Sequence, residues 1–177
     1  MIVRDALESD LPGVLAIYND AVLHTTAIWN DTVVDLANRR VWWKDRLARQ
    51  YPVLVATEGD CVLGYASFGD WRPFDGYRHT VEHSVYIHRD HRRRGIARSL
   101  MQPLIQKARE LGKHVMIAGI EAGNDPSIRL HTELGFQATA RMPQVGMKFG
   151  KWLDLIFMQL RLNDRASPDQ PAPLGRR

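Results

Sequence analysis

A strand that runs through a basic loop into a helix is the feature that most constrains how this chain folds. Residues 82–87 are rich in β-branched and aromatic side chains, and the loop 88–94 that follows contains four arginines. Gly95-Ile96-Ala97 then opens a helix pattern. A helix N-terminus presents free N–H groups and a partial positive charge, so this arrangement predicts a site for a phosphate chain.

The loop differs from the two best-known phosphate motifs. Gly-Lys-Ser/Thr does not follow it, as a Walker loop requires, and Gly-x-Gly-x-x-Gly of a dinucleotide-binding turn is absent. Arg-x-x-Gly-x-Ala at 92–97 gains weight from its place between a strand and an amphipathic helix. We expect the phosphate contacts to come from Arg92, Arg93, Arg94, Gly95, Ile96, Ala97, Arg98 and Ser99.

The rest of the chain predicts a mixed α/β sheet. Apolar periodicity and turn residues give strands near 2–4, 52–57, 61–68, 80–87, 114–120, 136–142 and 152–162, with helices near 11–22, 36–50, 96–111 and 126–134. The strand–helix–strand unit at 80–120 calls for one parallel pair, and the other neighbours are mostly antiparallel, with helices on both faces. Two loops are expected, at 69–78 and 143–151, and Pro103 predicts a kink or a broken hydrogen bond near Ser99.

Length and charge limit the function classes. The 177 residues fit one domain, 1–163, followed by a Pro-rich tail, 164–177, that we expect to be mobile. The formal charge of +4 is concentrated at a helix start. A DNA reader carries such charge along a recognition helix, so an anionic small molecule is favoured over nucleic acid.

Cysteine usage and hydropathy point to the cytoplasm. The single cysteine, Cys61, has no internal partner for a disulfide, and the N-terminus lacks the pattern of a signal peptide. No apolar run is long enough to span a membrane, so no membrane partner is expected. His24, His79 and His83 do not show the spacing of metal ligands, and no metal is expected.

The motif resembles the acetyl-CoA signature of the GNAT superfamily of N-acetyltransferases. Arg92–Ala97 matches Arg/Gln-x-x-Gly-x-Gly/Ala, and Asn124 and the segment Leu130–Phe136 match later family features. The resemblance covers residues 1–162. It implies a GNAT-like sheet whose parallel strands splay apart, with acetyl-CoA as co-substrate.

A closer resemblance is to the phosphinothricin acetyltransferase branch, which includes acetylases of methionine sulfoximine and methionine sulfone. It is carried by Ile17-Tyr18-Asn19, Thr26–Trp29, Gly64-Tyr65-Ala66, Thr80–Tyr86 and Gly146-x-Lys148-x-Gly150-x-Trp152-x-Asp154. The resemblance implies an amino-acid-like amine as acceptor. It also implies a homodimer, with the 143–152 loop near the partner and Lys148 able to reach the partner's pocket.

Acetyl transfer needs a base for the protonated amine, and Glu82 is the candidate. Strand alternation places Glu82, Ser84 and Tyr86 on one face and His83 on the other. The resemblance implies the same glutamate. The alternative is a structural carboxylate paired with a loop arginine.

The resemblance also implies where the cofactor lies. The thioester carbonyl would accept a backbone N–H near Val85 or Tyr86, and the pantetheine arm would run along Tyr86, Ile87 and His88. Asn124 would touch the cofactor, act as a helix cap, or do both. His131 would protonate the leaving thiolate, or it is a neutral core histidine.

The acceptor would be held by residues before and on the central strand. An acceptor carboxylate calls for arginine or backbone donors. The candidates are Trp29, Arg72, Pro73, Phe74, Asp75, Tyr77, Arg78, His83, Ser84 and Val85. Trp29, Phe74 and Tyr77 could instead serve core or dimer packing.

Other functions stay open on the sequence. The chain could acetylate another amine or a peptide N-terminus, although the bulky aromatics of the 71–77 loop argue against an open peptide groove. It could be a non-catalytic acetyl-CoA-binding module, or a nucleic-acid binder, which steep salt dependence of DNA affinity would reveal.

Overall fold

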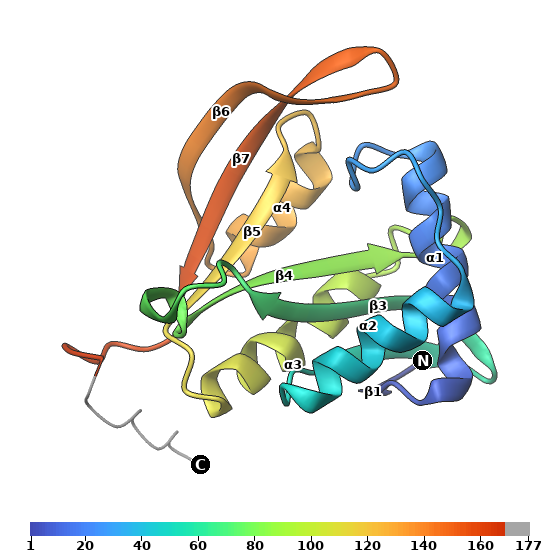
Figure 1. The fold of residues 1–177 in the computed structure, drawn as a ribbon, viewed down its shortest axis with the longest axis horizontal. Coiled ribbons are helices and arrows are strands. Elements are labelled where there is room, and N and C mark those ends of the chain that lie inside the picture. The colour runs from blue at the N-terminus through green and yellow to red at the C-terminus, as the bar shows by residue number, and fades with distance from the viewer. Residues whose placement is uncertain (169–177) are drawn as a thin grey trace.

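The computed structural model describes residues 1–168 as one twisted sheet with helices on both sides (Figure 1). The strands are β1 (Ile2–Asp5), β2 (Val53–Glu58), β3 (Cys61–Asp70), β4 (Thr80–Ile87), β5 (Val115–Glu121), β6 (Gln137–Lys148) and β7 (Lys151–Arg161). The helices are α1 (Leu11–His24), α2 (Leu36–Ala48), α3 (Ile96–Glu110) and α4 (Asp125–Glu133), with short 3₁₀ turns at Glu8–Asp10, Asp75–Tyr77 and Arg89–His91.

The sheet order is β1-β2-β3-β4-β5-β7-β6, and β4–β5 is its parallel pair while the other neighbours are antiparallel. This confirms the fold class expected from the sequence. The crossover from β4 to β5 is made by α3, as a parallel pair requires.

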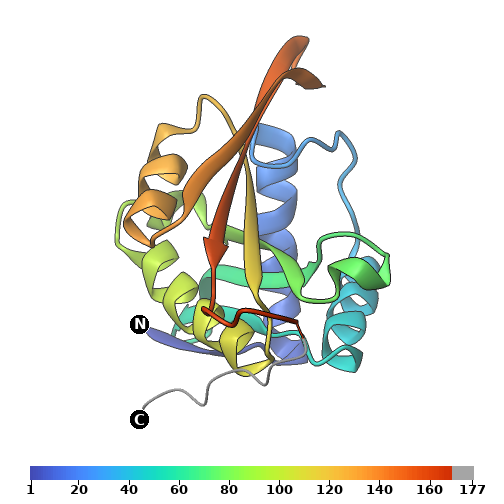
Figure 2. The same cartoon turned by 90° about the vertical axis from the view of Figure 1, so that its left-hand side faces the viewer.

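Figure 2 shows α3 and α4 on one side of the sheet and α1 and α2 on the other. An apolar cluster lies on each face, so each pair of helices has its own core. On one face α3 buries Ile96, Leu100 and Leu104 against β2, β3 and β4. On the other face Val14 and Ile17 of α1 pack with Val53, Val55, Val62 and Tyr65. The central strands are therefore covered on both faces, which explains their near-continuous apolar sequence.

The parallel strands part soon after they meet. β4 and β5 pair only at Thr80↔Val115, Val81↔Met116 and Glu82↔Ile117. Beyond Glu82, residues 83–87 keep their antiparallel partners in β3, but no described strand pairs with their other edge. Figure 1 shows the result, with β1–β4 running nearly level while β5, β7 and β6 rise away from them.

The predicted 143–151 loop is wrong. β6 continues to Lys148, and only Phe149-Gly150 turn the chain into β7. Both turn residues have positive φ, 52° and 71°, as a tight two-residue hairpin turn requires. Pro143 is accommodated because the register shifts between Met142 and Gly146, which frees this segment from ladder hydrogen bonds.

Two further expectations concern Pro103 and the tail. α3 runs unbroken from Ile96 to Glu110 through Pro103. Because proline has no backbone N–H, the Ser99 carbonyl lacks the helical hydrogen bond that residue 103 would otherwise donate. At the other end, Arg165 donates to the Gly112 carbonyl at 2.9 Å, so the start of the predicted tail lies against the domain. Residues 169–177 lie outside the described part of the chain, and the mobile tail stays a prediction.

Candidate active site

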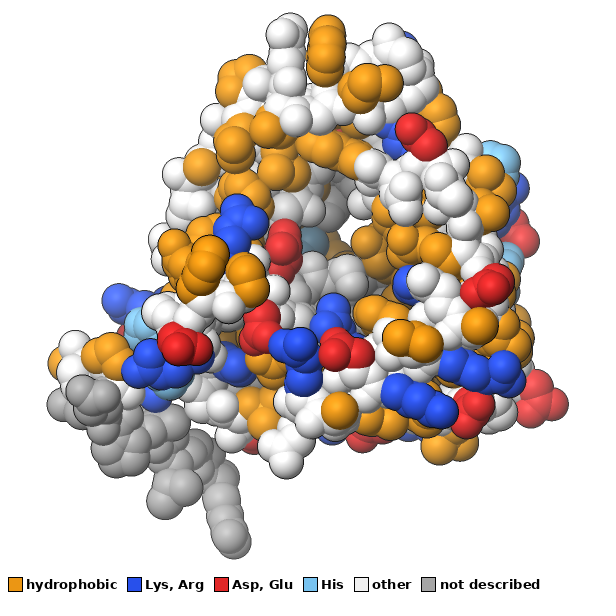
Figure 3. Space-filling view, in the orientation of Figure 1, with side chains coloured by type: hydrophobic (Ala, Val, Ile, Leu, Met, Phe, Trp, Pro, Cys, Tyr) orange, Lys and Arg blue, Asp and Glu red, His pale blue; other side chains and the backbone are white. Residues whose placement is uncertain are grey.

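A cleft lies where β4 and β5 part. Cavities of about 410, 330 and 90 Å³ adjoin there, and Ala27 and Gly119 line all of them. Glu82 lines the two larger ones. Figure 3 looks into this hollow, with hydrophobic side chains gathered over the β6–β7 hairpin and charged side chains along the lower rim. The splay thus produces one continuous site.

Glu82 projects into this cleft from the last paired position of β4. A Cβ at position 119 would lie 3.1 Å from its Oε1, so the carboxylate packs against the bare backbone of Gly119. Burial raises the pKa of Glu82, and the positive charge of Arg72 partly offsets that rise. Among residues 1–168, the Glu82 carboxylate has no hydrogen-bond donor and no ion-pair partner. The geometry therefore leaves it free to accept a proton.

The free edge of β4 suits an extended ligand. Residues 83–87 bond to β3 on one side and face the splay on the other. The Tyr86 side chain packs on Tyr65 with ring centroids 5.4 Å apart, and burial raises its pKa. Val85 and Ile87 pack against the opposite core. These residues therefore present their backbone N–H and C=O groups to the splay, as the predicted binding of the pantetheine arm requires.

The buried histidines His83 and His131 form a pair beside the splay. Their Nε2 atoms are 3.1 Å apart, and their rings stack with centroids 5.0 Å apart. His131 Nδ1 donates to the Ser127 carbonyl at 2.7 Å, since a carbonyl can only accept. In the neutral pair, His131 Nε2 must then accept from His83 Nε2, which leaves His83 Nδ1 buried with no partner among the described residues.

Burial lowers the pKa of both imidazoles. The neighbouring His131 lowers the pKa of His83 further, whereas the hydrogen bond to the Ser127 carbonyl partly offsets the lowering for His131. His131 is 2% exposed, yet both rings line the 90 Å³ cavity with Asn124. His131 is therefore a neutral, buried histidine at the edge of the splay. The thiolate-donor role stays a prediction.

The phosphate loop has the predicted form. Gly95 takes a left-handed φ of 74°, and α3 begins directly after it. The loop arginines are held by acids on neighbouring elements: Arg89 and Arg92 by Asp20, Arg94 by Glu58, and Arg98 by Glu133. These pairs fix the basic side chains around the helix N-terminus. Asn124 accepts the Ser127 N–H at 3.2 Å, so it caps α4 while also lining the splay.

The 410 Å³ cavity has the make-up of an acceptor pocket. Its charged lining residues are Glu82, Glu121 and Arg72, and Arg72 lies over the Trp71 ring at 4.8 Å. Its apolar walls are Trp29, Trp71, Met142, Val145, Leu155 and Phe157. A polar floor with apolar walls is typical of a small-molecule site.

A strap, residues 25–35, closes the cleft from the α1 side. The Trp29 ring packs against Gly146 so closely that a Cβ on residue 146 would lie 2.2 Å from Cε3 of Trp29. The Trp29 Nε1–H donates to the Thr26 carbonyl at 2.8 Å. Lys148 donates to the carbonyls of Val22 and Ile28. The strap is thus fastened to the β6–β7 hairpin.

The placement of Lys148 corrects one expectation from the resemblance. Lys148 is 2% exposed and is buried in its own chain. It therefore supports its own strap and does not reach toward another subunit. Lys148 is the buried side chain at the end of β6, while Met147, Phe149 and Trp152 beside it are exposed.

The 69–78 loop supplies less of the pocket than expected. Only Arg72 of its predicted residues lines the cavity. Phe74 is exposed, Tyr77 packs on Trp71 at 5.2 Å, and Arg78 donates to the Asp75 carbonyl within the loop. Pro73 lies in the same segment, outside the cavity lining. Ser84 and His83 line the neighbouring 330 Å³ cavity.

Sequence reasoning missed several lining residues: Ala27, Trp71, Gly119, Glu121, Met142, Val145, Leu155 and Phe157. Alternation along β5 could have identified Gly119 and Glu121 as one face, and Leu155 and Phe157 on β7 likewise. What the sequence lacked was the pairing of these strands, which places both faces beside Glu82.

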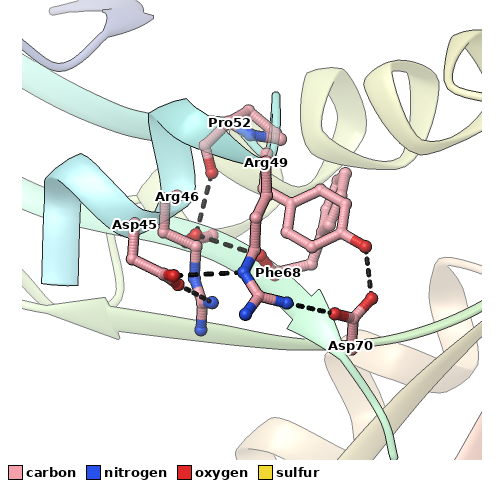
Figure 4. Close-up of polar contacts among 8 residues, drawn as sticks. Asp45, Arg46, Arg49, Pro52, Phe68 and Asp70 are labelled. Atoms are coloured by element: carbon pink, nitrogen blue, oxygen red, sulfur yellow. Dashed lines mark hydrogen bonds and ion pairs between the residues drawn. The ribbon is translucent and has the colours of Figure 1, made fainter. Parts of the chain in front are cut away.

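A cluster of polar side chains lies at the end of β3, beside the 330 Å³ cavity (Figure 4). Asp70 accepts from Tyr51 and, at 2.7 Å, from Arg49. Arg46 lies where a Cβ on Gly69 would be 2.7 Å from its Nη2, and it lines the 330 Å³ cavity. Burial raises the pKa of Tyr51 to about 12, so its hydroxyl remains a donor to Asp70. Gly69 faces Glu82 across the strands, so the cluster braces the strand beside the candidate base.

Comparison with known proteins identifies the architecture. The model of the acetyltransferase (GNAT) family matches residues 14–136. This chain belongs to the GNAT family. The resemblance inferred from the sequence is confirmed, and the early separation of β4 and β5 agrees with the splay that it implied.

Relatives of this GNAT chain act on amino acids. The L-amino acid N-acyltransferase MnaT of Escherichia coli K12 is 58% identical over 96% of this chain and 98% of its own. The L-methionine sulfoximine/L-methionine sulfone acetyltransferase of Salmonella typhimurium is 59% identical over 96% and 99%. A phosphinothricin N-acetyltransferase of Alcaligenes faecalis is 36% identical over 91% and 82%.

A solved structure supports the same reading of the fold. The acetyltransferase yncA of Salmonella typhimurium, determined with its cofactor acetyl-CoA, superposes with a TM-score of 0.94. It is 58% identical and covers 95% of this chain and 97% of its own. Among residues 1–168, no helix is long and apolar enough to cross a bilayer, and no group of three or more His, Cys, Asp or Glu is placed to hold a metal.

Proposed function

We propose that this GNAT enzyme transfers an acetyl group from acetyl-CoA to the α-amino group of an amino acid of the methionine sulfoximine, methionine sulfone or phosphinothricin type. The observation that carries this proposal is the free carboxylate of Glu82 at the head of an acceptor pocket that also holds Arg72. An amino acid carries an ammonium and a carboxylate. A base can take a proton from the ammonium while a neighbouring cation binds the carboxylate.

The chemistry follows from this placement. Glu82 takes a proton from the acceptor ammonium, directly or through a water, and the neutral amine attacks the thioester carbonyl. The C–N bond forms, the nitrogen gives up its second proton, the C–S bond breaks, and CoA leaves as a thiolate that takes up a proton. Backbone N–H groups at Val85 or Tyr86 would stabilise the oxyanion. In the neutral pair the one N–H of His131 is bonded to the Ser127 carbonyl, so His131 can act as the proposed donor to the thiolate only in its protonated form.

The cofactor would lie along the splay. Its pantetheine arm would bond the free edge of Tyr86, Ile87 and His88, and its pyrophosphate would sit on the N–H groups after Gly95. Arg92, Arg93 and Arg94 supply positive charge around it. The relative yncA was solved with acetyl-CoA, which supports this co-substrate.

We also propose a homodimer in the cytoplasm. The β6–β7 hairpin exposes large apolar side chains, with Met147 56%, Phe149 57% and Trp152 67% exposed. Contiguous exposed apolar residues mark interaction surfaces, and a second copy of this chain is the expected partner. Sedimentation should give twice the chain mass, and Phe149→Lys with Trp152→Lys should reduce it to the monomer.

The function is tested by detecting the N-acetyl product. Purified enzyme is incubated with acetyl-CoA and single amines, and products are identified by mass spectrometry. The panel holds L-methionine sulfoximine, L-methionine sulfone, phosphinothricin, unmodified amino acids and a short peptide. N-acetylation of the first three supports the proposal. Acetylation of the peptide alone would replace the substrate class, and no product from any amine would refute enzymatic acetyl transfer.

A further inference from the structure

We infer that Glu121 selects acceptors by charge, admitting amino acids with a neutral side chain and discriminating against those whose side chain carries a second anion. The inference rests on the proposed function and narrows its substrate class. It concerns a residue that the acid–base chemistry of Glu82 does not require.

Glu121 is held in place at the pocket wall. It shares the cleft face of β5 with Gly119, two positions along the strand. Its Oε1 accepts the Gly123 N–H at 2.8 Å, and its Oε2 accepts the Thr26 hydroxyl at 3.2 Å. Each oxygen therefore has one donor and retains capacity for another. No cation pairs with this carboxylate among residues 1–168.

The charge balance of the 410 Å³ cavity follows from its lining. Two of its residues are carboxylic acids, Glu82 and Glu121, and one is a cation, Arg72. The α-carboxylate of an amino acid would pair with Arg72, and its ammonium would lie near Glu82. The side chain of the acceptor would then contact the apolar walls and Glu121.

Acceptors of the proposed class differ in side-chain charge at this point. The sulfone and sulfoximine groups are neutral, and the sulfoximine N–H can donate to a carboxylate. The phosphinate of phosphinothricin is an anion and would meet Glu121 with no free cation beside it. Because apolar walls surround this carboxylate, the repulsion is screened less than it would be at an open surface.

The experiment compares kcat/KM for L-methionine sulfone with that for phosphinothricin. Glu121→Gln keeps the shape and removes the charge: its amide oxygen can accept the Gly123 N–H, and its NH2 can donate to the Thr26 hydroxyl oxygen, which reverses that hydrogen bond. We expect the sulfone-to-phosphinothricin ratio to fall on the order of ten-fold in this variant. The wild-type ratio should also fall as salt rises, while the variant's ratio should not.

Two controls separate charge from structure. Thr26→Val removes the hydroxyl contact but keeps the carboxylate, and Glu110→Gln removes an exposed acid of α3 outside the cavity. Neither should change the ratio. An unchanged ratio in Glu121→Gln, or an equal shift in Thr26→Val, would overturn the inference. Failure of the wild type to acetylate methionine sulfone would instead count against the proposed function.

Discussion

Glu82 and Ile117 are the last residues that β4 and β5 pair, so the candidate base stands where the parallel strands separate. The same step in the sheet that opens a binding cleft also delivers a carboxylate to its head. Gly119, two residues beyond Ile117, leaves the space that the Glu82 carboxylate occupies. The proposed acceptor pocket and the proposed cofactor edge therefore meet at one residue.

Replacing Glu82 tests its role as base. In Glu82→Gln we expect kcat/KM for the amine to fall about 10²- to 10⁴-fold, with unchanged acetyl-CoA affinity. The loss should be greatest at low pH, where the amine is protonated, and should narrow as pH approaches the amine's own pKa. Because burial raises the pKa of Glu82, the wild-type rate should rise with pH through a limb above the ordinary glutamate range. A variant with the wild-type pH profile would exclude this assignment.

Gly95 tests the phosphate site. In Gly95→Glu a bulky anion would stand at the start of α3, and the left-handed φ of 74° would add backbone strain. Calorimetric titration with acetyl-CoA should show affinity reduced at least about 100-fold. Gly112→Glu is the matched control, since Gly112 has a φ of 68° and open space at the other end of the same helix. If the Gly95→Glu and Gly112→Glu variants bound acetyl-CoA with equal affinity, the phosphates would not lie at Gly95.

Lys148 tests the strap. Lys148→Met leaves the buried carbonyls of Val22 and Ile28 without their donor, which should cost about 1–3 kcal/mol in the free energy of unfolding. Because the strap carries Trp29 and Thr26 into the pocket, KM for the amine should rise as well. Urea denaturation and amine titration measure the two effects. Lys151→Met, at an exposed position after the hairpin turn, should change neither; if it matches Lys148→Met, the strap contacts are unimportant.

The histidine pair predicts how stability depends on pH. The pKa values of His83 and His131 are lowered in the folded state, so the unfolded chain binds more protons once pH falls below about 6.5. Stability should be retained above that pH and fall below it, by at most about 1.4 kcal/mol per pH unit for each histidine. His83→Phe should reduce this slope in urea titrations from pH 5 to 8, whereas the exposed His24→Gln should not. A slope unaffected by His83→Phe would show that other groups titrate.

The sheet and the form of the basic loop before α3 could be predicted because their signals are local. Glu82–Ile87 reads as a strand from its own side chains, and Gly95 stands at the start of a periodic helix. The hairpin at 143–151 could not be predicted, because Pro143 and two glycines suggest a loop while the actual pairing depends on β7. Asp154 accepts the Gln144 N–H at 2.9 Å and steadies the irregular segment, a contact that no local pattern shows.

The candidate site was predictable along β4 and at a few positions elsewhere, since Trp29, Arg72, Asn124 and His131 also line the cavities. Glu82 and the backbone at Val85 and Tyr86 follow from strand alternation and from the family resemblance. Glu121 depends on how β5 faces β4 across the splay, and Lys148 on how the hairpin folds back over α1. Both belong to contacts between segments far apart in the chain, as the Thr26–Glu121 hydrogen bond illustrates.

The account is tested most directly by the release of free CoA thiol from acetyl-CoA in the presence of L-methionine sulfoximine. We expect release that requires both the amine and the enzyme, that saturates with amine, and that falls about 10²- to 10⁴-fold in Glu82→Gln. Release that is no faster with the amine than without it, for methionine sulfoximine and methionine sulfone alike, would contradict the account.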